Sequence, residues 1–274
     1  MNVPAPTALL DAYFRRIGDT GSREPTLATL HRLCAAHVQS IPFENLDVLL
    51  GRGINLDPAV VDRKLLHAGR GGYCFEHNTL LLRVLETLGF DVRPISARVR
   101  LQRPRDFTPA RTHVFVRVEL EGESWLADVG VGGLSPTSAL RLHTEDEQAT
   151  PHEPRRIVRQ DGRYFHQVRL ADAWSDVCEF TLEEMPAIDR EVGNWYTSAH
   201  PQSHFKSRLV VARAFPGGRV SILNRELTVR RGGVAETTVL ASPEALLEAL
   251  SEHFGLQFPP GTEFPCPALD WPAR

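Results

Sequence analysis

The chain has 274 residues, which is enough to bury a sizeable hydrophobic core in one large domain or two to three small ones. Its hydrophobic content of 42% and charged content of 24% are ordinary for a soluble globular protein, and a formal charge of −3 gives no bulk attraction to nucleic acid or anionic membrane. Because no apolar run approaches about 18 residues and the N-terminus lacks a signal-like segment, we expect a cytoplasmic protein with reduced cysteines and neither membrane nor nucleic acid as partner.

The first ninety residues have mainly helical periodicity. Apolar residues recur at helical spacing from Leu9 to Ile17, before Gly18, and again from Leu27 to Val38, before Ile41-Pro42. A third apolar stripe, over 80–88, follows Cys74. With short polar loops between them, these segments predict a helical domain over residues 1–90.

The block 70–78 combines a turn with a thiol at the opening of the third helix. Gly71 and Gly72 permit unusual backbone angles, and Cys74 falls in or beside the first helical turn, where the helix dipole favours thiolate. The carboxylate of Glu76 opposes this effect, so a nucleophile here needs a cationic partner such as an imidazolium. The alternative for Cys74 is a small buried hydrophobe, the usual role of a lone cysteine.

Two Cys-x2-His pairs raise the question of zinc. Cys74 and His77 form one pair, and Cys34 and His37 form the other. Closed structural zinc sites usually draw on clustered Cys-x2-4-Cys pairs, which this sequence lacks. We therefore predict no metal site.

After Phe90 the period changes to two. Alternating residues over 113–120, a turn at Glu121-Gly122 and an extended run over 123–130 predict a hairpin that pairs Leu120 with Glu123. In this register His113 and Asp128 are diagonal neighbours on one face, about 7 Å apart at the backbone.

An acid beside an imidazole fixes its tautomer and stabilises the protonated ring. We therefore predict Cys74 as nucleophile, His113 as base and Asp128 as the orienting acid. A strand histidine and an aspartate near a glycine-rich turn are also common without a catalytic role, and spacing alone does not bring Cys74 to the hairpin.

The remaining sequence predicts further strands over 156–168, 209–223 and 227–240, each folded around a glycine-containing turn. Ser242 caps a helix that ends at Gly255, and the proline-rich tail is expected to have no regular structure. The changes in periodicity divide the chain into three predicted domains: 1–90 with the nucleophile, 91–199 with the histidine and aspartate, and 200–274.

Five motifs, in order, resemble the arylamine N-acetyltransferase family: Ile41-Pro42-Phe43-Glu44-Asn45-Leu46, the block 70–78, Thr112-His113, Ala127-Asp128-Val129-Gly130 and Asn194-Trp195-Tyr196-Thr197-Ser198. The resemblance implies an α+β fold with an N-terminal helical bundle, a central β-barrel and a C-terminal α/β lid around a cysteine-protease-like catalytic core. It implies ping-pong transfer of acetyl from acetyl-CoA, a co-substrate rather than a tightly bound cofactor, through a cysteine thioester to an arylamine or hydrazine, as in xenobiotic metabolism.

Carried over by position, the resemblance assigns the triad to Cys74, His113 and Asp128. It places four residues at the acceptor site: Phe43, Val99, Val131 and Phe205. It places four near the CoA path: Thr112, Gly130, Gly132 and Gly133. Core packing is the alternative role of the apolar ones. Family members often carry Phe where this chain has Val131, which predicts a wider pocket and an altered preference among arylamines.

Arginines provide two further expectations. Arg98, Arg100, Arg103 and Arg105 either attract CoA phosphates or, as we favour, form a solvated basic stretch. Arg70 is expected to tie the nucleophile turn to a carboxylate. The competing functions are a macrolactam-forming amide synthase of the same family, a Cys-His-Asp thiol hydrolase and a non-catalytic binding protein. The sequence does not define the oligomeric state.

Overall fold

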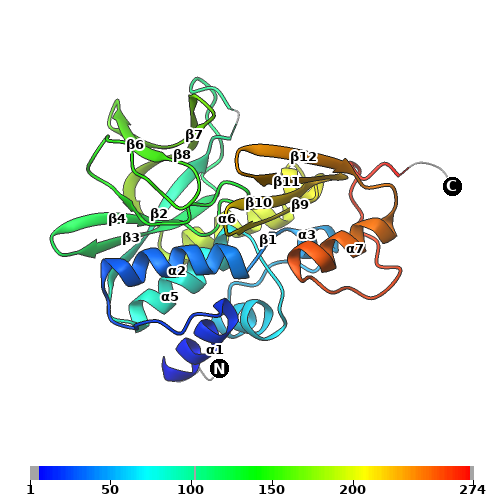
Figure 1. The fold of residues 1–274 in the computed structure, drawn as a ribbon, viewed down its shortest axis with the longest axis horizontal. Helices are drawn as coiled ribbons and strands as arrows, with labels where there is room; N and C mark the ends of the chain where they lie inside the picture. Colours follow the sequence, from blue (N-terminus) through cyan, green and yellow to red (C-terminus); the bar gives the residue numbers. More distant parts are fainter. Residues whose placement is uncertain (1–5, 102, 272–274) are drawn as a thin grey trace.

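The computed structural model describes residues 6–101 and 103–271, and its first part is a group of helices (Figure 1). Two caps explain where helices start: Thr26 accepts a hydrogen bond from the backbone of Thr29, and Asp57 accepts one from Ala59 ahead of a helix that begins with proline. The helices are α1 (Pro6–Ile17), α2 (Leu27–Ser40), α3 (Leu46–Leu49), α4 (Pro58–Asp62) with a π-helical turn (Arg63–His67), and α5 (Cys74–Thr87).

A seven-stranded antiparallel sheet follows and curls into a nearly closed barrel. Its order is β5-β4-β3-β2-β8-β7-β6. Gln148 links the two edge strands, because its side chain bonds the backbone of Arg141 and its own backbone bonds Arg155. The strands are β2 (Asp91–Val99), β3 (His113–Leu120), β4 (Glu123–Ala127), β5 (Leu140–Arg141), β6 (Arg155–Gln160), β7 (Arg163–Leu170) and β8 (Ala173–Glu184).

The predicted hairpin register is confirmed where β3 pairs with β4. Leu120 faces Glu123, and the turn between them has positive φ at Glu121 (53°) and Gly122 (79°), which matches the twist of the strands. Val118 and its neighbours on one face pack against α2 and α5, which lie beneath these strands in Figure 1. Phe115 and the opposite face point into the barrel core. The alternating pattern therefore separates a helix-facing side from a barrel-facing side.

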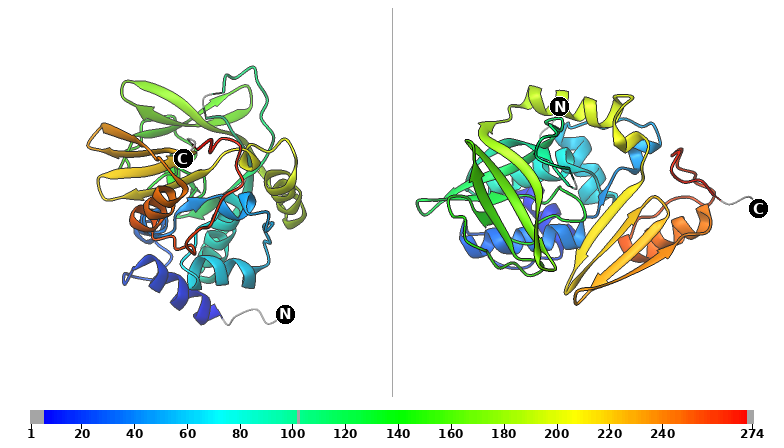
Figure 2. Two further views of the ribbon diagram at one scale, coloured as in Figure 1. Left: turned by 90° about the vertical axis from the view of Figure 1, so that its right-hand side faces the viewer. Right: turned by 90° about the horizontal axis from the view of Figure 1, so that it is seen from above.

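A second sheet of five strands, in the order β1-β9-β10-β11-β12, forms the C-terminal part and is covered by α7 (Figure 2). Ser242 caps α7, and Gly255 ends it with φ of 69°. The bounds are β1 (Phe43–Glu44), β9 (Val210–Phe215), β10 (Gly218–Leu223), β11 (Glu226–Arg231), β12 (Val234–Val239) and α7 (Pro243–Phe254). The predicted strands, capped helix and irregular tail are confirmed over the described residues.

The sequence prediction missed several elements: strands β1, β2, β5 and β8, and helices α3, α4 and α6 (Ala187–Ala199). Strand β2 contains Pro94, β8 carries several charges, and α6 exposes apolar residues such as Ile188, so none of these three shows a clean buried face. A short 3-10 helix (His204–Lys206) follows α6. Over the described part of the chain, no helix has the length and apolar character that spanning a membrane demands.

The predicted divisions at residues 90 and 199 fall between elements, since α5 ends at Thr87, β2 begins at Asp91 and α6 ends at Ala199. However, β1 lies within the first predicted domain and pairs with β9 of the third. Leu46 and Leu49 also pack into the C-terminal core. The three domain ranges stay predictions.

Candidate active site

The turn before Cys74 is fixed by backbone contacts with the segment around Phe43. Glu44 donates its N–H to the carbonyl of Gly72 at 2.7 Å, and Gly72 donates to Pro42 at 3.3 Å. A side chain on Gly71 would place its Cβ only 2.0 Å from the Pro42 oxygen, so this position requires glycine. As a result, the first residue of α5 is held rigidly, and Cys74 is buried with 5% of its surface exposed.

A network of buried and half-buried charged side chains holds this turn in place. The Arg70 guanidinium bonds Glu44 at 2.6 Å and Asp47 at 3.2 Å, which confirms that Arg70 ties the turn to a carboxylate. Lys64 bonds Asp47 at 2.9 Å and Glu76 at 2.7 Å. The Glu76 charge is thus balanced by a lysine, which reduces its opposition to a thiolate nearby.

His113 and Asp128 form a buried pair at the start of β3 and just beyond β4. Their Nε2 and Oδ2 atoms are 2.8 Å apart, and each residue is 1% exposed. Burial alone lowers the pKa of His113, but the Asp128 carboxylate and then the Cys74 side chain outweigh it and raise the pKa to about 10. Burial likewise works to raise the pKa of Asp128, and His113, Asn78 and the Gly130 N–H overcome it and lower the pKa. The geometry favours an ionised carboxylate beside a protonated ring.

Asn78 connects the nucleophile helix to this pair, one turn after Cys74 on α5. Its Nδ2 donates to the Val114 carbonyl at 2.6 Å and to Asp128 Oδ1 at 2.9 Å, and its Oδ1 accepts from Val129 N at 3.0 Å. Sequence reasoning did not single out Asn78. Its position four residues after the cysteine, on the same helix face, was the available signal.

The Cys74 thiol lies beside Thr112, the residue before His113. Cys74 Sγ donates to the carbonyl of Thr112 at 3.5 Å. Gly130 packs against the same point, because a Cβ there would lie 2.8 Å from the Cys74 Cα atom. The structure therefore brings Cys74, His113 and Asp128 together although they are far apart in the sequence.

The predicted acceptor residues fall into two groups. Phe43 and Phe205 share an apolar cluster with Cys74, and their ring centroids are 6.1 Å apart. Val99 and Val131 belong instead to the barrel core, where Val131 is 7% exposed. The structure therefore does not group these two valines with the thiol.

The predicted CoA residues lie along the loop after β4 and before β3. Gly132, with φ of 84°, packs on the Phe43 ring, where a Cβ would lie 3.5 Å from a ring carbon. A Cβ on Gly133 would lie 3.8 Å from Ala212. Thr112 is half-buried and Gly130 contacts Cys74, as described above. Thr112 and Gly130 therefore contact Cys74, Gly132 contacts Phe43, and Gly133 lies next to Ala212 of the same apolar cluster.

The expectation of a solvated basic stretch is wrong for Arg100, which is buried, whereas Arg105 is exposed as expected. Arg100 is 1% exposed, and its guanidinium bonds Glu179 and the carbonyls of Pro104 and Phe107. Arg105 pairs with Asp176 at 2.7 Å. Local sequence does not reveal these partners because both acids lie more than seventy residues away, on β8.

Among the described residues, one group has donor atoms close enough for a metal: His113, Asp128 and Cys178, within 4.8 Å of one another. One imidazole, one carboxylate and one thiol suit a borderline divalent ion. The hydrogen bond between His113 and Asp128 already uses one atom of each. The histidines of the two Cys-x2-His pairs share a hydrogen bond with each other instead, with His37 Nε2 and His77 Nδ1 2.8 Å apart. The predicted lack of a metal stays a prediction.

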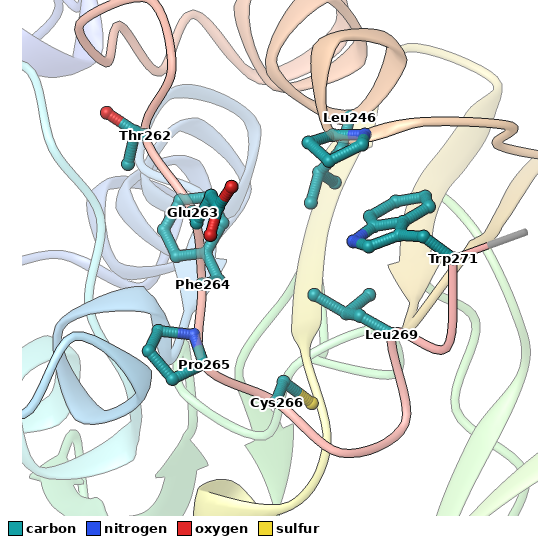
Figure 3. Close-up of a pocket in the computed structure, with 9 residues that line it drawn as sticks. Leu246, Thr262, Glu263, Phe264, Pro265, Cys266, Leu269 and Trp271 are labelled. Atoms are coloured by element: carbon teal, nitrogen blue, oxygen red, sulfur yellow. The ribbon is translucent and has the colours of Figure 1, made fainter. Parts of the chain in front are cut away.

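A separate hollow of about 260 Å³ lies between α7 and the C-terminal tail (Figure 3). Leu246 and Trp271 face Phe264 across it, and Cys266 lies at its lower edge in this view. None of its lining residues belongs to the Cys74 cluster.

Comparison with known proteins gives consistent results. The sequence model of the N-acetyltransferase family matches residues 26–261. An arylamine N-acetyltransferase from Mycolicibacterium smegmatis is 42% identical over 90% of this chain and 91% of its own length. The structure of the arylamine N-acetyltransferase from M. tuberculosis superposes with a TM-score of 0.87 at 42% identity, covering 90% of this chain and 93% of that one. The Mycobacterium marinum enzyme in complex with CoA gives 0.87 at 38% identity, covering 90% and 92%.

Proposed function

Because the chain belongs to the arylamine N-acetyltransferase family, we propose that it carries acetyl from acetyl-CoA, through a thioester on Cys74, to the nitrogen of an arylamine or hydrazine. The observation that carries the assignment of residues is the buried His113–Asp128 pair, 2.8 Å apart, beside the Cys74 thiol. This arrangement supplies a nucleophile, a proton acceptor and a fixed counter-charge.

In the first half-reaction, the proton of the Cys74 thiol already resides on His113, and the Cys74 thiolate attacks the acetyl carbonyl. The tetrahedral intermediate collapses by breaking the carbonyl bond to the CoA sulfur, and His113 returns the proton to that sulfur. One thioester is exchanged for another, so the step is close to thermoneutral. Activation and positioning of the sulfur therefore matter more than driving force.

In the second half-reaction, the neutral amine attacks the acetyl group on Cys74. His113 accepts a proton from the nitrogen, the carbon–sulfur bond breaks, and the proton passes to the departing Cys74 sulfur. The products are an amide and the free enzyme. Arylamines suit this step because their nitrogens are little protonated at neutral pH.

Asp128 acts on both steps through the ring of His113. Since Asp128 bonds Nε2 at 2.8 Å, the opposite nitrogen, Nδ1, is left to exchange protons with sulfur, and it has no hydrogen-bond partner among the described residues. Asn78 holds the carboxylate in place. Together they keep an imidazolium stable without allowing it to rotate.

Phe43 and Phe205 support an acceptor site of aromatic character, because both rings adjoin the Cys74 cluster. We retain Val99 and Val131 as acceptor residues by similarity, and Thr112, Gly130, Gly132 and Gly133 along the CoA path. We also retain a cytoplasmic location and a role in xenobiotic metabolism. The amide synthase and the thiol hydrolase are not favoured, because the reported relatives carry the name arylamine N-acetyltransferase.

One experiment tests the proposal. Purified protein is mixed with acetyl-CoA, peptide mass spectrometry measures acetyl on Cys74, and CoA release is followed after an arylamine is added. Cys74→Ser should abolish both signals, because an alcohol is far less acidic than a thiol. Cys266→Ser, which changes a partly exposed thiol in another part of the fold, is the matched control. A folded wild-type protein that gives neither signal would remove the acetyltransferase assignment.

A further inference from the structure

A second hollow, of about 220 Å³, lies on the barrel where β2 and β8 meet the loop that leads into β3. Ser96 and Arg98 on β2, Arg111 in the loop, Arg163 on β7 and Glu179 on β8 line it. We call it the arginine hollow. Strands β2, β8 and β7 are neighbours in the sheet, so these side chains are held on a rigid surface.

The arginines that line the arginine hollow outnumber the carboxylates that pair with them. Arg163 bonds one oxygen of Glu179 at 2.9 Å, while the buried Arg100 takes the other oxygen. Among the described residues, Arg111 pairs with one carboxylate, that of Glu183, whose side chain is 63% exposed. Arg98 donates to the Pro109 carbonyl, and no carboxylate pairs with it in the described part of the chain. Arg111, Arg163 and the neighbouring Arg100 therefore share two carboxylates, and in the described part of the chain Arg98 has none.

Two further observations indicate that an acceptor is missing. Ser96 is 4% exposed, and its hydroxyl has no hydrogen-bond partner among the described residues. Partial burial lowers the pKa of Arg98, and the nearby positive charge of Arg111 lowers it further. A buried donor without a partner and guanidinium groups that repel one another are both stabilised by an oxyanion.

We propose that the arginine hollow binds one oxyanion, a phosphate or a carboxylate, that belongs to a substrate of the acetyl transfer. The hollow adjoins the reacting residues, since Arg111 precedes Thr112, whose carbonyl contacts the Cys74 sulfur. Ser96 also pairs across the sheet with Val114 of the Cys74 cluster. The substrate role rests on the proposed function. The oxyanion is either a phosphate of acetyl-CoA or the carboxylate of an aminobenzoate acceptor.

The first test measures binding of inorganic phosphate by calorimetry and needs no activity. Wild type should bind phosphate, and Arg98→Gln should weaken the Kd about tenfold, because it removes one charge-assisted contact. Arg93→Gln, on the same strand but outside the hollow and paired with Asp91 and Glu184, should bind like wild type. Arg111→Gln, at an exposed position, repeats the test if Arg98→Gln fails to fold. Wild type that does not bind phosphate, or variants that bind it equally well, would overturn the site.

The second test identifies the source of the oxyanion. Acetylation of Cys74 is measured with acetyl-CoA and with p-nitrophenyl acetate, an uncharged donor, and turnover is measured with aminobenzoate and anisidine. If Arg98→Gln raises the KM about tenfold for acetyl-CoA alone, the oxyanion in the hollow is a phosphate of CoA. If it raises the KM for aminobenzoate alone, the oxyanion is the carboxylate of the acceptor. Unchanged KM values for all four overturn the substrate role. A wild type that never acetylates Cys74 refutes the proposed function instead, while the phosphate titration still decides the hollow.

Discussion

A chain of buried hydrogen bonds behind the nucleophile makes the protein sensitive to acid. Tyr13 OH lies 3.0 Å from His37 Nδ1, and His37 Nε2 lies 2.8 Å from His77 Nδ1. His77 Nε2 then lies 3.0 Å from the carbonyl oxygen of Gly72, two residues before Cys74. Because the last acceptor is a carbonyl, His77 must donate from Nε2 and accept from His37. Every link is satisfied when both rings are neutral.

Protonation of His77 would place two N–H groups opposite each other in a site where both rings are fully buried. Burial accordingly lowers the pKa of His77 to about 4, although the carbonyls of Pro42 and Gly72 act in the opposite direction. The unfolded chain has an ordinary histidine pKa of about 6.5, so it binds this proton first as the pH falls. The free energy of unfolding should therefore decrease between pH 6.5 and 4, by about 1.4 kcal/mol per pH unit or about 3 kcal/mol in all for His77.

Urea unfolding at a series of pH values between 7 and 4 checks this. In His77→Gln, an uncharged amide replaces the imidazole, and the variant should lose about 3 kcal/mol less than wild type over this range, whatever its stability at pH 7. His143→Gln, at an exposed position, should retain the full wild-type loss. A His77→Gln protein with the same pH slope as wild type would refute the neutral-chain reasoning.

Three other predictions concern the site. Asp128→Asn removes the counter-charge that raises the pKa of His113 to about 10, so Cys74 acetylation should slow by about a hundredfold, and its loss at high pH should begin at a lower pH. An unchanged pH profile in stopped-flow acetylation would contradict this. Gly130→Ala forces a Cβ to 2.8 Å from the Cys74 Cα atom and should lower kcat at least about tenfold, which steady-state kinetics would detect. Val131→Phe should destabilise the barrel core by about 1–3 kcal/mol in urea unfolding and change the ranking of p-aminosalicylate, aminobenzoate, anisidine and hydralazine; an unchanged ranking would exclude Val131 from acceptor selection.

Local periodicity in the sequence was sufficient to predict several features of the fold and of the candidate site. Alternation along 113–120 and the Glu121-Gly122 turn predicted the register of β3 and β4, which placed His113 and Asp128 on one face. The glycine pair and the apolar stripe predicted that Cys74 falls in or beside the first turn of a helix, and α5 begins at this residue. These inferences succeeded because a turn and a two-residue period constrain neighbouring residues directly.

Other features depended on partners distant in the sequence. Arg100 was expected in solvent, but it is buried against Glu179 of β8. Asn78 was not singled out, because its role requires the loop that follows β4 to lie against α5.

The sequence by itself therefore determined which residues could act as nucleophile, base and acid, and which hairpin face carries two of them. Only the tertiary structure decided that α5 brings the Cys74 sulfur to that hairpin and that lysine and arginine balance the carboxylates beneath it. The physical reason is that a hydrophobic pattern specifies which side of an element is buried, whereas the side chain that it meets there is set by the packing of the whole chain.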